Sequence, residues 1–275
     1  MKPLALVIEN DSGTRKLLDV LLSRFGFEVD LVASGSDALT LLEIVQYDVL
    51  ILDLLIPGKS GAEILEWIGR ERPAMLSRVV VLSSSSPARL EAVRGEWPGV
   101  RTIRKPFELG EVVEAAAEAS KDRVPREATA GENFCRFSVR AGAKAGVIVA
   151  TSGGAVEPVL TFGYAAEDVT RFFPMSVDAA YPLCSSIRNA KPVWIASIAG
   201  AGTDYPMLQP VWAKNGSRAL AVVPLLQDGR AVGAAGWTFR EPRLFTEREQ
   251  QLLTEIAAGV VDWLPDHPTR AQAGA

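Results

Sequence analysis

The first 120 residues alternate short apolar runs with stretches whose apolar positions recur at helical spacing. The apolar runs have the length of strands and lie at 4–8, 27–32, 49–52, 79–82 and 100–103. The stretches between them predict helices at 17–25, 34–45, 62–68, 89–94 and 109–120. Strands that are apolar throughout are typical of a parallel sheet covered on both faces. The alternation therefore predicts a doubly wound α/β domain with a five-stranded parallel sheet.

The second half of the chain has a different pattern. Strand-like runs lie at 146–151, 159–162, 193–198, 219–225 and 231–238. The pair Asp228-Gly229 separates the last two runs, which predicts a hairpin. A capping box of Thr246 and Glu249 precedes an apolar stripe, which predicts a helix from about Thr246 to Leu264. We therefore expect an α+β domain with an antiparallel sheet.

A charged stretch separates the two patterns. Residues 120–127 hold five charged residues and a proline, a composition typical of a linker. We expect the α/β domain over 1–121, a linker over 122–131, the α+β domain over 132–266 and a tail over 267–275.

Composition narrows the chemistry that the chain can carry. Lys and Arg number 29 against 33 Asp and Glu, and no basic stripe stands out, which argues against binding to nucleic acid. The apolar runs are too short to span a membrane and no signal-peptide pattern follows Met1, so we expect a cytoplasmic protein without membrane contacts. The two cysteines lack CxxC spacing, and the single histidine, His267, lies in the proline-flanked tail. Thiolate metal sites and histidine-dependent catalysis are therefore not expected.

Polar residues follow four of the five strands predicted in the first half. Glu9 and Asn10 come after the first strand, Asp53 ends the third, Ser83 ends the fourth and Lys105 follows the fifth. Functional groups of open α/β sheets gather at the carboxyl ends of the strands. We therefore expect these side chains along one edge of the sheet.

Such a cluster suits phosphoryl transfer. Neighbouring carboxylates repel one another unless a cation lies between them, and Mg²⁺ prefers one or two carboxylates with water and a phosphate. A carboxylate can act as the nucleophile toward phosphorus, and the reaction needs mainly positioning and charge neutralisation. Asp53 is thus the candidate for an acyl phosphate, while Lys105 and Ser83 are the candidates to contact the phosphoryl group.

Residues 1–121 resemble the receiver domain of two-component response regulators. The resemblance lies in Leu6–Asp11, in Tyr47–Gly58 around Asp53, in Val81–Ser83 and in Lys105-Pro106-Phe107. It implies that a histidine kinase or a phosphotransfer protein phosphorylates Asp53. It also implies Mg²⁺ held by Asp53, by Glu9 and Asn10, and by the backbone carbonyl of Leu55.

Two positions depart from the receiver pattern. The family usually has two acidic residues where this chain has Glu9-Asn10, so Asn10 keeps an oxygen ligand but lacks a charge. Thr102 stands where the family often has an aromatic residue whose rotation reports phosphorylation. We therefore expect weaker Mg²⁺ binding and no aromatic relay.

Residues 132–266 resemble a GAF domain. The resembling segments are 160–164, 181–184, 191–195, 205–206, 221–225, 229–234 and 243–246. The resemblance implies an antiparallel sheet with helices on one face and a ligand pocket on the other. Trp194, Tyr205 and Trp237 are aromatic candidates for an apolar pocket of this kind. The sequence matches the signature of cyclic-nucleotide-binding GAF domains only in part, which argues against that ligand. A covalently bound bilin is not expected either, because Cys184 has no histidine near it in the sequence.

The combined interpretation is a response regulator, not an enzyme, that signals through its GAF domain or a protein partner. One alternative is a GAF module that binds a small molecule or forms a homodimer, with a receiver that is not phosphorylated. The stripe of the last helix would pack on its own sheet or on a second copy. A hydrolase is a third alternative, although Glu157, Asp178 and Asp204 form no recognisable catalytic set.

Overall fold

The computed structural model describes residues 1–199 and 204–264. It divides into two compact units, one over Met1–Glu127 and a second that begins at Ala128, and each unit has its own sheet. The predicted tail over 267–275, with His267, lies outside the described residues. Within the described ranges, no helix is long and apolar enough to cross a membrane.

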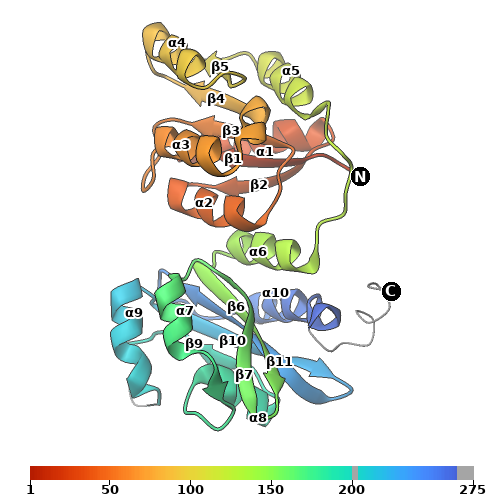
Figure 1. Cartoon of the computed structure of the whole chain (residues 1–275), viewed down its shortest axis with the longest axis vertical. Coiled ribbons are helices and arrows are strands. Elements are labelled where there is room, and N and C mark those ends of the chain that lie inside the picture. Colours follow the sequence, from red (N-terminus) through yellow and green to blue (C-terminus); the bar gives the residue numbers. More distant parts are fainter. Residues whose placement is uncertain (200–203, 265–275) are drawn as a thin grey trace. The chain divides into compact units, whose positions relative to one another are not determined.

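The N-terminal unit is a parallel sheet between two layers of helices. Its elements are β1 (Leu4–Ile8), α1 (Ser12–Arg24), β2 (Glu28–Val32), α2 (Gly35–Ile44), β3 (Val49–Asp53), α3 (Gly61–Glu71), a 3₁₀ turn (Pro73–Arg78), β4 (Val79–Ser83), α4 (Pro87–Glu96), β5 (Arg101–Arg104) and α5 (Leu109–Ser120). The strand order is β2-β1-β3-β4-β5, and every pairing is parallel. Helices α1 and α5 cover one face, and α2, α3 and α4 cover the other (Figure 1). The expected doubly wound α/β domain is confirmed.

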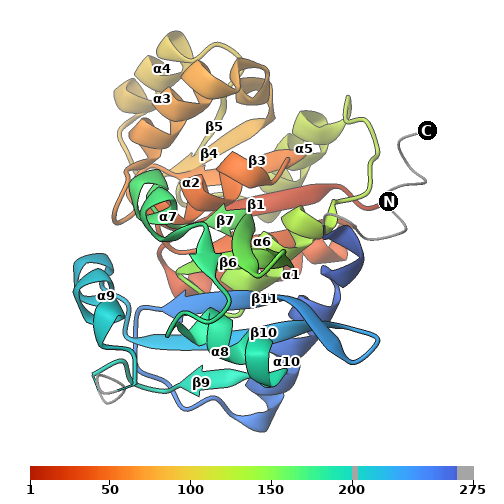
Figure 2. The ribbon, with the colours of Figure 1, turned by 60° about the horizontal axis from the view of Figure 1, so that its bottom comes forward.

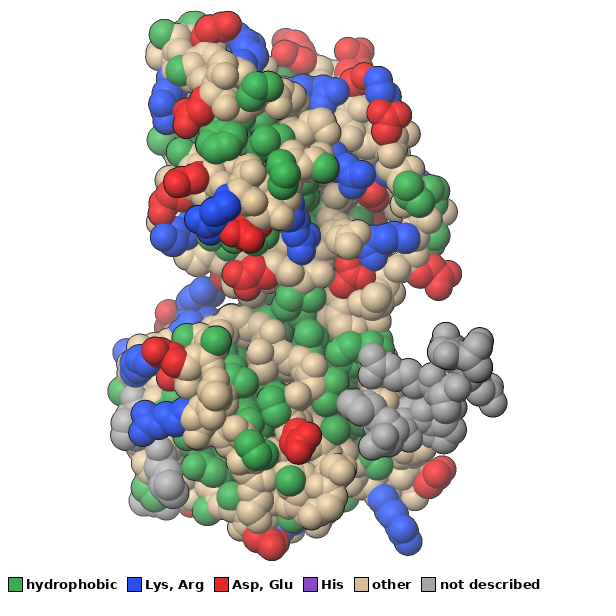
Figure 3. Space-filling model, in the orientation of Figure 1, with side chains coloured by type: hydrophobic (Ala, Val, Ile, Leu, Met, Phe, Trp, Pro, Cys, Tyr) green, Lys and Arg blue, Asp and Glu red, His purple; other side chains and the backbone are tan. Residues whose placement is uncertain are grey.

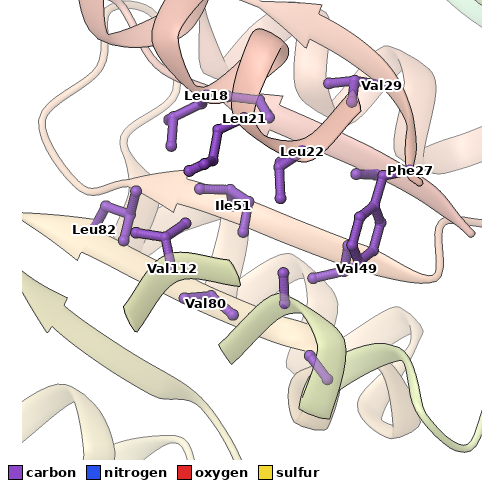
Figure 4. Close-up of a cluster of buried hydrophobic side chains, with 14 of the residues drawn as sticks. Leu18, Leu21, Leu22, Phe27, Val29, Val49, Ile51, Val80, Leu82 and Val112 are labelled. Atoms are coloured by element: carbon purple, nitrogen blue, oxygen red, sulfur yellow. The ribbon is translucent and has the colours of Figure 1, made fainter. Parts of the chain in front are cut away.

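A core of hydrophobic side chains joins this sheet to α1 and α5 (Figure 4). Leu18 and Leu22 of α1 are fully buried against Val49 and Ile51 of β3, whereas Leu17 is 44% exposed. The difference follows from the helical period, which turns only one stripe of α1 toward the sheet. Each buried leucine side chain contributes about 1.5–3 kcal/mol relative to an exposed one.

The second unit is built on an antiparallel sheet. Its elements are α6 (Ala130–Arg140), β6 (Ala145–Ser152), β7 (Ala155–Phe162), α7 (Ala166–Phe172), β8 (Met175–Ser176), α8 (Pro182–Asn189), β9 (Val193–Ile195), a 3₁₀ turn (Pro206–Leu208), α9 (Gln209–Asn215), β10 (Ala219–Gln227), β11 (Arg230–Phe239), α10 (Glu247–Ala258) and a 3₁₀ turn (Val261–Trp263). The strand order is β8-β7-β6-β11-β10-β9. Helix α8 packs on β10 and β11 from one side, and α6 and α10 contact each other on the opposite side (Figure 2). The expected α+β domain and the hairpin at Asp228-Gly229 are confirmed.

Three local expectations for this unit need correction. The strand expected over 193–198 ends at Ile195, because only Val193–Ile195 pair with β10. The last helix begins with the expected capping box but ends at Ala258, where Gly259, a poor helix former, follows. Helix α6 was not predicted, although Thr129 and Glu132 form a capping box at its start.

The surface differs between the two units. On the face drawn in Figure 3, charged side chains of both signs intermix over the N-terminal unit. The same view shows more hydrophobic and fewer charged side chains over the second unit.

Candidate functional site

The sheet of the N-terminal unit brings the predicted polar residues to its carboxyl edge. Asp53 is the last residue of β3, and Glu9 directly follows β1. Because Ile8 of β1 pairs with Leu52 of β3, the two carboxylates lie on adjacent strands at the same level of the sheet. Lys105 directly follows β5, and its backbone N–H donates to the Ser83 carbonyl at the end of β4 at 2.9 Å.

One lysine joins the two carboxylates. Lys105 Nζ donates to Asp53 Oδ2 and to Glu9 Oε2, each at 2.6 Å. Glu9 and Asp53 are buried, at 2% and 7% exposure, whereas the Lys105 side chain is 20% exposed. The ammonium therefore occupies the mouth of the site and the acids line its floor. With two carboxylates and one ammonium, the cluster carries a formal charge of −1.

The electrostatics of Lys105 reflect this pairing. Burial lowers the pKa of its ammonium, but the hydrogen bonds to Asp53 and then to Glu9 outweigh burial and raise it above the ordinary value. Lys105 thus stays charged across the physiological range. A charged donor at this place can neutralise an anionic group that arrives at Asp53.

Backbone N–H groups hold the second oxygen of each acid. Leu55 N donates to Asp53 Oδ1 at 3.0 Å, and Asp11 N donates to Glu9 Oε1 at 3.1 Å. Each carboxylate is therefore fixed by one amide and by the shared ammonium of Lys105. Fixed orientation is what a nucleophilic carboxylate needs, because it lowers the entropic cost of reaching the reactive geometry.

Ser83 lies at the same carboxyl edge of the sheet, but its hydroxyl makes hydrogen bonds within its own loop. The side chain is fully buried, donates to Ser85 Oγ at 3.0 Å and accepts from Ser85 N at 3.2 Å. The structure thus brings Glu9, Asp53 and Lys105 together, while the Ser83 hydroxyl bonds within its own loop. A local turn of this kind forms readily after a serine.

Asn10 and Leu55 lie at the outer rim of the site. Asn10 is exposed, and its carbonyl accepts from Arg15 Nη1 at 3.1 Å. The same guanidinium nitrogen donates to the Glu9 carbonyl at 2.7 Å, so Arg15 ties α1 to the loop that carries the acids. Sequence reasoning missed Arg15; its only signal was an arginine in the first turn of the helix that follows the acidic loop. Leu55 is likewise exposed.

The residues of this site fit a magnesium ion. Two carboxylate oxygens converge on a single cationic atom, and oxygen ligands on a rigid edge suit a hard divalent cation. Among the described residues, no three His, Cys, Asp or Glu side chains form a ready metal cluster. The remaining ligands would be the Asn10 amide, the Leu55 carbonyl and water, and Mg²⁺ commonly retains several waters.

Thr102 has a polar partner of its own. Arg94 Nη1 of α4 donates to Thr102 Oγ1 on β5 at 3.0 Å. At the position where the receiver pattern often has an aromatic ring, this chain therefore has a threonine hydroxyl that accepts a hydrogen bond from an arginine.

The three aromatic candidates in the second unit have different surroundings. Trp237 is among the residues lining an apolar cavity there, but its indole packs on Phe134 with 5.6 Å between ring centroids and donates to Ser138 Oγ. Trp194 packs on Phe245 instead, and neither Trp194 nor Tyr205 is among the lining residues. Alternate positions of a strand face opposite sides of the sheet. Val193 and Ile195 therefore pack on the side of the sheet that holds the cavity, whereas Trp194 faces the other side.

Comparison with family models agrees with the two folds. A response regulator receiver domain model matches residues 5–117, and a GAF domain model matches residues 127–262. The chain is a receiver domain followed by a GAF domain. Both resemblances noted in the sequence are thereby confirmed.

Individual relatives share part of this receiver–GAF chain. The transcriptional regulatory protein DltR of Streptococcus agalactiae is 30% identical over 109 residues, which are 39% of this chain and 47% of the relative. The transcriptional regulatory protein FixJ of Rhizobium meliloti is 31% identical over 122 residues, 44% of this chain and 59% of the relative. The chain therefore spans about half the length of the curated relatives it matches.

Solved structures also match part of the chain. A response regulator receiver domain protein from Clostridium thermocellum has 25% identity and a TM-score of 0.40, and it covers 43% of this chain and 94% of that structure.

Proposed function

We propose that this protein is a phosphorelay response regulator whose Asp53 receives a phosphoryl group from a histidine kinase or a phosphotransfer protein. The observation that carries the proposal is the Lys105 ammonium, which is 2.6 Å from a carboxylate oxygen of both Asp53 and Glu9 at the carboxyl edge of the sheet. The receiver family to which residues 5–117 belong supports a role in two-component signalling.

In the proposed reaction a carboxylate oxygen of Asp53 attacks the phosphorus of a phosphohistidine on the partner. The new O–P bond forms as the P–N bond breaks, and the imidazole leaves with the bonding electron pair. Leu55 N–H orients the attacking carboxylate through Asp53 Oδ1. Lys105 moves its hydrogen bond from Asp53 to the transferred group and neutralises part of its charge.

Glu9, Asn10, Asp53 and the Leu55 carbonyl are the proposed ligands of Mg²⁺. When bound, Mg²⁺ neutralises charge on the transferred phosphoryl oxygens. Glu9 is the buried acid that accompanies Asp53, so its charge holds a cation beside the nucleophile. Ser83 is proposed to contact the phosphoryl group after its hydroxyl leaves Ser85.

The output is proposed to run through the GAF domain or through a protein partner, without catalysis and without direct DNA binding. The family models account for residues 5–117 and 127–262 with two regulatory modules. The formal net charge is −4, which disfavours binding to a polyanion.

Intact-mass measurement after incubation with acetyl phosphate and Mg²⁺ tests the proposal. We expect one phosphate adduct on the wild type and none on Asp53→Asn or when Mg²⁺ is omitted. Asp11→Asn is the matched control, because Asp11 is an exposed acid of the same loop whose side chain caps α1. An adduct that persists on Asp53→Asn would contradict the assignment. No adduct on the wild type would favour a binding or dimerisation module with an inactive receiver.

A further inference from the structure

The GAF domain contains an apolar cavity that the receiver chemistry does not use. Its volume is about 110 Å³, and it lies between the sheet and helices α7, α8 and α9. Val147 and Val222 form part of its floor, and Phe172, Leu183 and Trp212 form part of its roof. A dry cavity of ~150 Å³ holds a benzene ring. This apolar cavity therefore has room for a compact group of about one small ring or a short branched chain.

One buried hydroxyl at this cavity lacks a partner. Thr238 of β11 lines the apolar cavity and is only 3% exposed, and its Oγ1 makes no hydrogen bond within the described part of the chain. The Tyr164 hydroxyl faces it: burial raises the pKa of Tyr164 to about 12, and the Thr238 side chain, as a hydrogen-bonding neighbour, lowers it in part, although the two hydroxyls do not reach hydrogen-bond geometry. A fully buried polar group without a partner is destabilising, so a fold that retains one calls for an explanation.

A polar cavity of about 260 Å³ adjoins the apolar one. The two cavities share lining residues, Thr238, Tyr164 and Ser217 among them. Lys144 lines the polar cavity, and its ammonium makes no hydrogen bond or ion pair with any residue the structure describes. Burial, and then the nearby Arg240, lowers the pKa of Lys144.

The two acids of the polar cavity share another lysine, which neutralises one of their two charges. Lys214 Nζ is 3.0 Å from Glu167 Oε1 and 3.2 Å from Asp168 Oδ1. The two lysines and two acids of this cavity therefore sum to zero formal charge, with the unpaired positive charge at Lys144. Because Lys214 is shared by both acids, Lys144 is the cation of this lining left to pair with a ligand, and it can pair with one negative charge.

We propose that the GAF domain binds a small organic monocarboxylate with a compact apolar body. The carboxylate accepts hydrogen bonds from Lys144 Nζ and Thr238 Oγ1, and the apolar body fills the cavity beside Phe172 and Trp212. The proposal does not depend on phosphorylation of Asp53. It excludes nucleotides and phosphate esters, because their bulk exceeds the apolar cavity and their charge meets Glu167 and Asp168.

Titration calorimetry on the full chain tests the ligand class with matched probes. Phenylacetate carries a ring and one carboxylate, phenylacetamide replaces the charge by a neutral amide, and acetate lacks the ring. We expect phenylacetate to bind at least about tenfold more tightly than phenylacetamide, because a charge-assisted hydrogen bond to Lys144 is stronger than a neutral one. We expect no measurable heat with acetate. Equal affinity for the acid and the amide, or no binding of phenylacetate at millimolar concentration, would overturn the proposal.

Two substitutions locate the site. Lys144→Met should weaken phenylacetate binding about tenfold or more, whereas Lys191→Met, the matched control at an exposed position that lines neither cavity, should change it less than about threefold. A similar loss from both would show a diffuse charge effect and refute the assignment of Lys144. Thr238→Val keeps the shape of the side chain, so it should weaken binding and yet raise the thermal midpoint of the unliganded protein by a few degrees, since an unpartnered hydroxyl is removed. A lowered midpoint would show that Thr238 already has a partner and would overturn its role.

Discussion

Removing the charge of Lys105 is the sharpest test of how the receiver site is held together. Lys105→Met keeps an unbranched chain of similar length but leaves Glu9 and Asp53 without their shared ammonium. Both acids are buried and each is 2.6 Å from the lysine nitrogen. In Mg²⁺-free buffer the two carboxylates then repel each other, and the hydrogen-bond donors left to them among the described residues are the backbone amides of Asp11 and Leu55.

The stability lost in Lys105→Met can be estimated from the distance between the charges and from their burial. At an effective dielectric constant of about 20, unit charges 2.6 Å apart attract by about 6 kcal/mol, before the desolvation of both ions is subtracted. Removing one partner of a buried pair costs about 3–5 kcal/mol, whereas an exposed pair contributes about 0–1 kcal/mol. The Lys105 side chain is 20% exposed, which places it nearer the buried limit. We therefore expect Lys105→Met to lower the unfolding free energy of the receiver domain by about 2–4 kcal/mol.

Hydrogen exchange read by mass spectrometry measures this loss within the receiver domain of the full chain. Amides of β1 and β3 should exchange about 30- to 1000-fold faster in Lys105→Met, since each 1.4 kcal/mol is a factor of about ten. Mg²⁺ should restore much of the protection because it replaces the missing positive charge. Lys121→Met is the matched control: Lys121 pairs with Glu118 at the surface, where solvent screens the pair, so its loss should leave the exchange of β1 and β3 essentially unchanged.

A double-mutant cycle with Asp53→Asn separates the pair from general effects of the substitution. We expect a coupling of at least about 1.5 kcal/mol between Lys105 and Asp53 in the absence of Mg²⁺. A loss in Lys105→Met no larger than in Lys121→Met, or a coupling near zero, would refute the view that this ammonium neutralises the acids.

Three further outcomes are expected. Asn10→Asp adds a carboxylate at the exposed rim, so it should tighten Mg²⁺ binding roughly tenfold in a fluorescence titration; unchanged affinity would exclude this position as a ligand. The hydrogen bond from Arg243 lowers the pKa of Glu249 from 4.5 to about 2. The stability that Glu249 contributes is therefore present above pH 4.5 and lost as the pH falls toward 2, and thermal melts of wild type and Glu249→Gln should converge over that range. A methyl group on Gly35 would lie 1.8 Å from a backbone oxygen of the β3–α3 loop, so Gly35→Ala should cost about 1–3 kcal/mol in urea unfolding. Gly95→Ala meets no atom within 4 Å and should be neutral or stabilising.

Local sequence patterns determined the elements and the edge on which the receiver site lies. Every residue of β1, β3 and β4 is buried, and four or five apolar positions in a row identified these strands without reference to partners. A short-range capping signal did the same for the start of α10. Because parallel strands end at a common edge, Glu9, Asp53 and Lys105 could be grouped from their places along the chain alone.

Only the tertiary structure decided which side chains meet. Lys105 reaches Asp53 across 52 positions and Glu9 across 96, and such contacts depend on the register of strands that are distant in the chain. Ser83 has the expected place but bonds to Ser85, a choice made by loop geometry that composition does not express. In the GAF sheet, apolar residues point to both faces, so the sequence pattern could not tell that Trp194 lies away from the cavity. The unpartnered hydroxyl of Thr238 likewise becomes visible only when every neighbour is in place, because the lack of a hydrogen-bond partner is a property of the packed fold and not of any local segment.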